Sequence, residues 1–110
     1  MHKIQYNKLV RDKIPEIIKQ ANKQPKTRPL KSEGYLFKLA EKLNEEVQEY
    51  LTTGSIEELV DVVDVVDAIL KHRGISLAEF NTMRKEKNQN RGGFDKKILL
   101  EYVLSENGDE

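Results

Sequence analysis

The sequence predicts an all-α protein, a helical bundle of about four helices. Three observations lead to this fold class. Apolar residues within 36–51 recur at the three- and four-residue spacing of one helix face. Ser55 and Ser76 each stand three residues before a glutamate, which is the spacing of a helix capping box. Gly54 and Gly74 follow periodic apolar segments, where glycine commonly ends a helix.

The first expected helix begins near Pro15, after an extended N-terminal segment. Proline suits the first turn of a helix, because its φ angle fits and the amide proton that it lacks has no helical acceptor there. Asp12 is the expected N-cap, and the apolar side of this helix consists of Ile14, Ile17, Ile18 and Ala21. Pro25 and Pro29 then indicate a loop, with a short strand at residues 27–30.

The second and third helices are expected to be joined by a tight turn. The second starts near Tyr35, and its apolar stripe consists of Leu36, Leu39, Ala40, Leu43, Val47, Tyr50 and Leu51. The third covers residues 56–70. Its string LVDVVDVVDAIL has the valine content of a strand, but its acids recur every three residues rather than every two, which favours a helix. It is apolar over more than half of its circumference, so we expect it to be central or buried against another subunit.

A fourth, mostly polar helix is expected from the Ser76 capping box to about Asn88, followed by a loop at residues 90–93. The C-terminal segment 97–103 is short and rich in β-branched and aromatic residues, which favours a strand. We expect this segment to pair with residues 27–30 as an accessory β pair beside the helices.

The composition excludes several kinds of site. Without cysteine, the chain has no disulfide, no thiolate nucleophile and no Cys-ligated zinc. His2 and His72 are too few and too far apart in the sequence for a His-rich metal site. No apolar run reaches membrane-spanning length, and the first residues do not resemble a signal peptide. These features predict a cytoplasmic protein without a membrane partner.

The formal net charge of zero conceals a segregation of charge along the chain. Residues 1–31 carry nine Lys/Arg and two Asp/Glu, residues 32–70 carry two and ten, and residues 71–97 carry eight and three. Carboxylates that bind a cation, flanked by Lys and Arg that bind phosphate oxygens, would give this pattern. Three solvated faces are the alternative explanation. Nucleic-acid binding is disfavoured by the zero net charge and the central acids.

Helix geometry distinguishes the acids of the second helix. At about 100° per residue, Glu46 falls beside Leu39 at the edge of the apolar stripe, and Glu49 lies about 60° further out. An acid next to a buried face is costly unless it is paired or bound to metal. Glu46 is therefore the best candidate ligand, Glu49 can share its ion, and Glu45 is expected on the solvent side.

The acids of the third helix form a ladder with steps of three residues, Glu58, Asp61, Asp64 and Asp67. Each step rotates by about 60°, so the four cannot all reach one ion. Because helices joined by a tight turn run antiparallel, the first two acids are favoured over the middle two as the pair facing the second helix. Glu58 has an alternative role as the capping partner of Ser55. Asp67 needs a Lys or Arg, a backbone donor or a second metal as its partner.

Five segments in this order resemble the all-α nucleoside triphosphate pyrophosphohydrolases, the MazG-like group, and within it the phosphoribosyl-ATP pyrophosphohydrolase-like branch. They are YNKLVRDKIPEII (residues 6–18), EEVQE (45–49), EELVD (57–61), RGISLAEF (73–80) and RGGFDKKILLE (91–101). The resemblance covers nearly the whole chain. It implies a single domain over residues 1–110 that is dimeric or larger.

The resemblance implies a site for Mg²⁺ or Mn²⁺ at the positions that match the two acidic motifs of the family, which are Glu46, Glu49, Glu58 and Asp61. The implied reaction is hydrolysis of the α–β phosphoanhydride of a nucleoside triphosphate, giving a nucleoside monophosphate and pyrophosphate. Glu49 and Glu45 are the candidates for the catalytic base. The gap between Glu49 and Glu58 is shorter than in many MazG proteins, so no base specificity is implied.

The two basic arms provide the candidate phosphate contacts, which are Lys8, Arg11, Lys13, Lys87 and Arg91. Gly92 and Gly93 follow the last of these and would let backbone N–H groups approach an anion. A solvated basic surface is the alternative for each of the five side chains.

Two classes of function remain. The leading hypothesis is a Mg²⁺-dependent nucleoside triphosphate pyrophosphohydrolase, a homodimer or higher homo-oligomer that removes non-standard nucleotides. The alternative is a non-catalytic helical dimer that binds nucleotide and metal as a sensor or interaction module.

Overall fold

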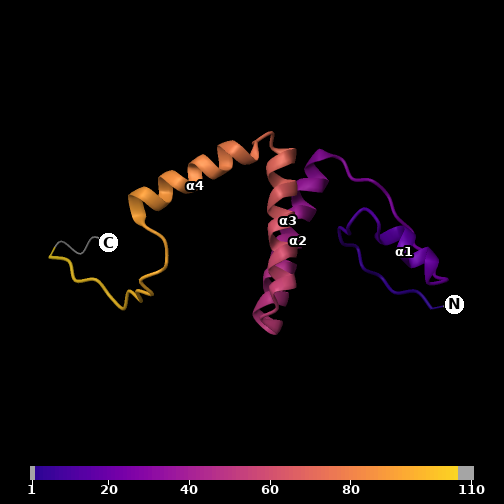
Figure 1. Cartoon of the computed structure of the whole chain (residues 1–110). Helices are drawn as coiled ribbons and strands as arrows, with labels where there is room; N and C mark the ends of the chain where they lie inside the picture. Colours follow the sequence, from indigo (N-terminus) through magenta and orange to yellow (C-terminus); the bar gives the residue numbers. More distant parts are fainter. Residues whose placement is uncertain (1, 107–110) are drawn as a thin grey trace. The chain divides into compact units, whose positions relative to one another are not determined.

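The regular structure of the chain is helical. The computed structural model describes residues 2–106 and contains, in that part, α1 (Ile14–Gln20), α2 (Ser32–Thr53), α3 (Ile56–His72) and α4 (Leu77–Arg91) (Figure 1). This confirms the predicted all-α class with four helices. The chain divides into two compact units, one up to Ser76 and the other from Leu77 onward. The single-domain organisation stays a prediction, and the two units are described separately.

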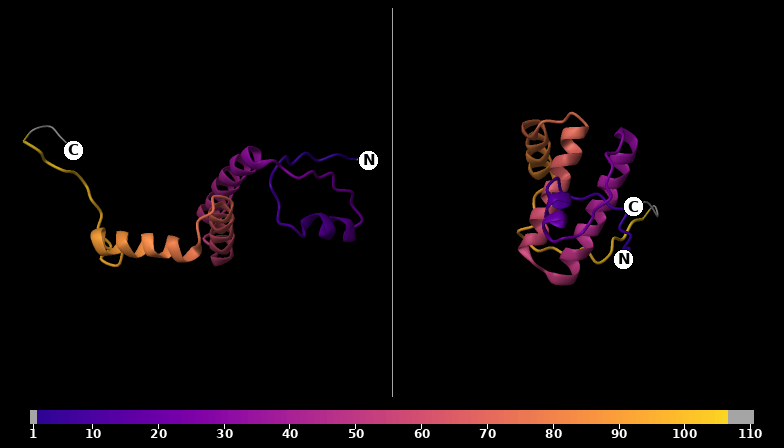
Figure 2. Two further views of the ribbon diagram at one scale, coloured as in Figure 1. Left: turned by 90° about the horizontal axis from the view of Figure 1, so that it is seen from above. Right: turned by 90° about the vertical axis from the view of Figure 1, so that its right-hand side faces the viewer.

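A hairpin of α2 and α3 is the centre of the first unit. The two helices lie side by side in every view and share most of the contacts between elements (Figures 1 and 2). Gly54 ends α2 in the left-handed conformation, with φ 67°, and its N–H donates to the Tyr50 carbonyl at 2.7 Å. The Ser55 hydroxyl then accepts from the Glu57 N–H at 3.2 Å and caps α3. Gly and Ser thus reverse the chain within two residues, as the sequence predicted.

The interior of the hairpin is small. Among the described residues, the buried apolar side chains are Leu39, Val65 and Leu70. At the open end of the hairpin, the His72 ring packs edge-on against Tyr35, with 5.0 Å between ring centroids. His72 Nε2 also lies 2.8 Å from the Ser32 hydroxyl. These contacts hold the start of α2 against the end of α3.

The N-terminal segment before the short helix α1 is irregular rather than extended throughout, with a bend at Lys8 and a turn at residues 12–13. Pro15 lies in the first turn, but the N-cap is Lys13 rather than Asp12, and no side chain caps the helix. The prediction of Asp12 as N-cap is therefore wrong. The segment is tied to α2, because Lys38 Nζ donates to the Asn7 carbonyl at 2.8 Å.

The predicted β pair is absent from the described part of the chain. Residues 27–30 and 97–103 are both irregular, and neither contains a strand. Pro29 has no amide proton to donate to a neighbouring strand, and Pro25, just before this segment, has none either. The apolar side chains of 98–104 are instead 65–87% exposed. Composition favoured a strand here, but no backbone partner is present to form one.

The second unit contains α4, which is polar and contributes no buried residue. The helix begins at Leu77 as predicted but continues to Arg91, beyond the expected end at Asn88. Gly92, with φ 81°, follows it, and its N–H donates to the Asn88 carbonyl at 2.8 Å. The predicted loop at residues 90–93 is therefore wrong for its first two residues. No described helix is long and apolar enough to cross a membrane.

Candidate metal centre

Glu46 is the one buried charged residue of the described chain, with 5% of its surface exposed. It lies on the side of α2 that faces α3, nearly two turns after the buried Leu39. Glu46 thus lies at the edge of the apolar stripe, as helix geometry predicted.

Two groups of carboxylates share Glu46. One consists of Glu45, Glu46 and Glu49 on α2, and the other of Glu46 with Glu58 and Asp61 on α3. Within each group the nearest carboxylate oxygens lie within 4.8 Å of one another, close enough for a single ion. The first two acids of the α3 ladder are therefore the pair that meets Glu46, as the antiparallel hairpin predicted. Glu49 belongs to the other group, on the side of Glu45.

One carboxylate oxygen of Glu46 pairs with a lysine, and the other has no hydrogen-bond partner among the described residues. Oε1 lies 3.0 Å from Lys42 Nζ, one helical turn earlier. Oε2 is buried and has no hydrogen-bond partner within the described part of the chain. A buried carboxylate oxygen without a partner is energetically costly, so Oε2 is a natural ligand for a cation that enters between the helices.

The electrostatics of Glu46 agree with this geometry. Burial raises the pKa of Glu46 above its ordinary value; the Lys42 ammonium opposes this shift and the adjacent Glu49 carboxylate adds to it. Burial lowers the pKa of Lys42, but its bond to Glu46 and the charges of Glu45 and Glu46 reverse this, so the pKa is raised overall. Lys42 therefore stays charged and offsets only part of the cost of ionising Glu46.

Glu58 is not the capping partner of Ser55. The backbone N–H of Glu58 donates to the Ser55 carbonyl at 3.2 Å, and the Ser55 N–H donates to the Thr53 hydroxyl at 3.1 Å. The capping-box prediction is thus right for the Ser55 hydroxyl and wrong for the Glu58 side chain. This carboxylate is half-buried and lies with Glu46 and Asp61.

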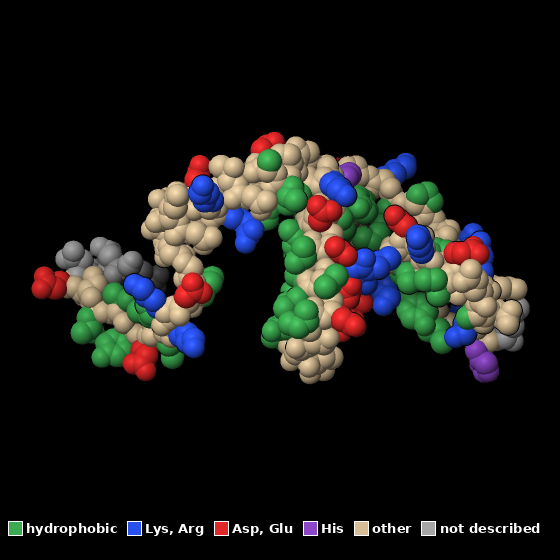
Figure 3. Space-filling view, viewed as in Figure 1, with side chains coloured by type: hydrophobic (Ala, Val, Ile, Leu, Met, Phe, Trp, Pro, Cys, Tyr) green, Lys and Arg blue, Asp and Glu red, His purple; other side chains and the backbone are tan. Residues whose placement is uncertain are grey.

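Two basic side chains of the N-terminal segment contact the acids. Lys8 Nζ lies 3.2 Å from Glu45 Oε1, and Arg11 Nη2 lies 2.6 Å from Asp61 Oδ1 and 2.8 Å from Asp64 Oδ2. Figure 3 shows acidic and basic side chains side by side over the middle of the hairpin. Two of the five predicted phosphate contacts thus lie at the candidate metal centre.

The remaining acids also contact basic side chains. Glu45 was expected in solvent but is half-buried, with Lys42 Nζ 3.5 Å from its Oε1. Asp64 pairs with Arg11, and Asp67 pairs with Lys71 at 3.2 Å. The expected partner of Asp67 is therefore a lysine, one helical turn later.

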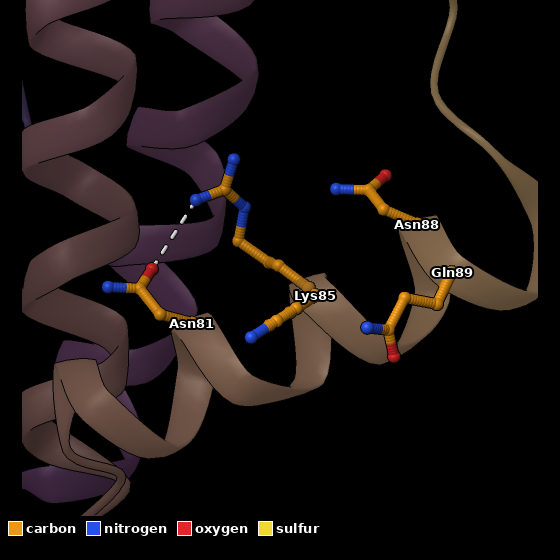
Figure 4. A pocket seen from close by; sticks show the side chains of 5 residues that line it. Asn81, Lys85, Asn88 and Gln89 are labelled. Carbon is orange, nitrogen blue, oxygen red and sulfur yellow. Dashed lines mark hydrogen bonds between the residues drawn. The ribbon is translucent and has the colours of Figure 1, made fainter.

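The other three predicted phosphate contacts are exposed. Lys13 is at the N-cap of α1, and Lys87 and Arg91 are on α4 in the second unit. A shallow hollow on α4 is lined by Asn81, Arg84, Lys85, Asn88 and Gln89, with Arg84 bonded to the Asn81 side chain at 3.3 Å (Figure 4). Neither Lys87 nor Arg91 lines this hollow. Its lining also contains no acid, so it offers no ligand set for a metal.

Sequence reasoning did not identify Lys42 as part of the centre. Its spacing of four residues before Glu46 was the available signal, because side chains at that separation meet on one helix face. The pairing of Arg11 with α3 had no such signal, because it joins residues 50 positions apart.

No protein-family model, curated protein or solved structure matches this chain.

Proposed function

We propose that the protein is a Mg²⁺-dependent nucleoside triphosphate pyrophosphohydrolase that releases a nucleoside monophosphate and pyrophosphate. The observation that carries the proposal is the buried, unpartnered Glu46 Oε2 at the junction of the two carboxylate groups. The Lys42 ammonium already contacts Oε1. A metal cation at Oε2 would offset the remaining cost of burying the carboxylate.

The donor set suits Mg²⁺, with Mn²⁺ as a substitute. The ligands would be Glu46, Glu58 and Asp61, with Glu49 at the α2 side, and all of them offer oxygen only. Mg²⁺ prefers oxygen ligands and keeps several waters beside a few carboxylates, which leaves positions for phosphate oxygens. Basic side chains lie directly beside these acids, as a polyphosphate would require.

When bound, the metal would neutralise charge on the triphosphate and acidify a coordinated water. Glu49 is assigned as the base that accepts a proton from the attacking water, because it is exposed and its carboxylate has no ion pair among residues 2–106. Glu45 is less suited, since Lys8 and Lys42 already share its Oε1. Lys8 and Arg11 would bind the phosphate oxygens and orient the α–β linkage that water cleaves.

The first experiment tests the metal centre and the reaction together. Glu46→Gln and Asp61→Asn each remove one ligand charge while keeping the shape of the side chain. We expect both to reduce Mg²⁺-dependent pyrophosphate release by roughly a hundredfold or more, because the metal is held by few ligands. A screen of canonical and modified nucleoside triphosphates, including phosphoribosyl-ATP, supplies the substrate.

Glu57→Gln is the matched control, because Glu57 is exposed on the first turn of α3 and belongs to neither carboxylate group. Undiminished turnover in both ligand variants would refute the assignment. Tight, metal-dependent nucleotide binding without any product over long incubation would instead support the non-catalytic sensor.

A further inference from the structure

Arg11 connects the candidate metal centre to a carboxylate outside it. Its Nη2 lies 2.6 Å from Asp61 and 2.8 Å from Asp64. Asp61 belongs to the carboxylate group around Glu46, whereas Asp64 belongs to neither of the two groups found among the described residues. One guanidinium is therefore shared between an acid that would bind metal and an acid that would not.

Arg11 reaches these acids from the irregular N-terminal segment rather than from the hairpin. Neighbouring residues hold that segment against α2, through Lys38 on the Asn7 carbonyl and Lys8 on Glu45. The Arg11 side chain itself is 54% exposed. Its backbone is thus kept close to the centre while its guanidinium remains free to change partners.

Lys42 contrasts with Arg11. It lies on the same helix as its partner Glu46, only 17% of its side chain is exposed, and it occupies Oε1 while Oε2 stays available. A metal can therefore bind Glu46 without displacing Lys42. Arg11 likewise contacts only Oδ1 of Asp61, but it is more exposed and has Asp64 as a second partner, so repulsion from a divalent cation at Asp61 can move it.

We propose that Arg11 is an exchangeable counter-ion of the metal centre. It neutralises Asp61 before the cation binds, and Asp64 then retains it beside the ion, where it binds the oxygens of a polyphosphate. This inference rests on the proposed function and assigns Asp64 as a positioning residue. Arginine suits this exchange, because its planar fork of five N–H donors can keep one bond to Asp64 and offer others to phosphate.

The exchange predicts opposite effects on the two ligands. Without Arg11, a cation on its own has no competitor at Asp61, so it binds more tightly. A polyphosphate added to the metal-loaded protein loses a contact, so it binds less tightly. A merely structural role for the ion pair predicts weaker binding of both.

The test measures Mn²⁺ binding by electron paramagnetic resonance, alone and with inorganic triphosphate as the probe. For Arg11→Ala we expect Mn²⁺ to bind roughly fivefold more tightly, the size of one exposed ion pair, and triphosphate to bind the Mn²⁺-loaded protein roughly fivefold less tightly. Arg28→Ala is the matched control, because it removes the same charge from an exposed loop position.

Asp64→Asn supplies the second arm. It leaves Arg11 on Asp61 alone, so Mn²⁺ binding should weaken, and triphosphate binding should weaken as well. Both effects should largely disappear in the Arg11→Ala background, because Asp64 acts through Arg11. Unchanged or weaker Mn²⁺ binding by Arg11→Ala, or an Asp64→Asn effect that persists without Arg11, would overturn the proposal.

The same titrations separate this inference from the proposed function. A wild-type protein that binds no Mn²⁺, or a Glu46→Gln variant that binds it as the wild type does, contradicts the metal centre itself. Wild-type binding that Glu46→Gln abolishes, with no gain in Arg11→Ala, contradicts only the exchange.

Discussion

At the scale of single residues, the site depends on an acid that the fold makes difficult to ionise. Glu46 is buried between α2 and α3, and Lys42 satisfies one of its two oxygens. Protonation of the other oxygen, or a cation bound to it, would each lower the free-energy cost of burying the carboxylate. A proton and a metal ion would therefore compete for the same carboxylate.

This competition gives a pH prediction for the metal-free protein. Because the pKa of Glu46 is raised above 4.5 in the folded state, the folded protein holds this proton more tightly than the unfolded chain does. The contribution to stability is complete below pH 4.5 and is lost as the pH rises through the raised pKa. We expect the unfolding free energy of the wild type to fall relative to that of Glu46→Gln as the pH rises over that range. Urea unfolding in the presence of a chelator measures both. A difference that stays constant would contradict this.

Residue-level prediction from sequence was successful where helix geometry applies. Rotation per residue identified Glu46 as an acid at a buried edge. The antiparallel course of the hairpin identified the first acids of the α3 ladder as its neighbours. The prediction placed Glu45 in solvent, since a helical wheel contains no information about Lys8, which arrives from another segment. The contact of Arg11 with α3 was inaccessible for the same reason.

At the scale of elements, the α2–α3 turn brings the ligands together. Gly54 has φ 67°, a conformation that costs a residue with a Cβ atom roughly 1–2 kcal/mol. We expect Gly54→Ala to lower the unfolding free energy by about that amount, measured by thermal or urea denaturation, and to weaken metal binding through the hairpin.

Gly34→Ala is the matched control for this substitution. Gly34 lies within α2, and the nearest atom to a Cβ built there is Leu30 Cδ2 at an ordinary 4.0 Å. Alanine favours a helix over glycine, so this variant should be more stable by roughly 0.5–1 kcal/mol. Equal destabilisation by both substitutions would show that the left-handed turn is not the cause.

The elements that sequence predicted well were those with periodic apolar residues and explicit ends. The α2–α3 hairpin has both, and the rejection of a strand at LVDVVDVVDAIL is confirmed by α3. The β pair was wrong because composition records the preference of a segment but not the presence of a partner strand, and Pro29 removes a donor that pairing would use.

At the scale of the whole molecule, α3 leaves apolar side chains without cover. Ile56, Val60 and Val63 recur at helical spacing and are 54–72% exposed. The sequence predicted a helix that is either central or buried against another subunit, and burial against a second copy stays a prediction. The oligomeric state is thus open to a direct test.

We expect the wild type to be a dimer or larger by light scattering, and Val60→Glu or Val63→Glu to shift it towards the monomer, because a charge on the stripe would be buried by association. Ile17→Glu is the matched control on α1, where the wild-type side chain is equally exposed, at 54%. A monomeric wild type, or the same mass in all variants, would contradict assembly through α3.

The two-residue turn also determines when the site can form. Every candidate ligand lies within residues 45–61, so closing the hairpin assembles the whole ligand set with little loop entropy. Such local contacts form early and quickly during folding. A cation that binds only the closed hairpin would stabilise it by mass action, by about 2.7 kcal/mol at a hundred times its dissociation constant. Because the apolar interior of the hairpin is small, the metal concentration would then determine the folded fraction of the protein as well as its activity.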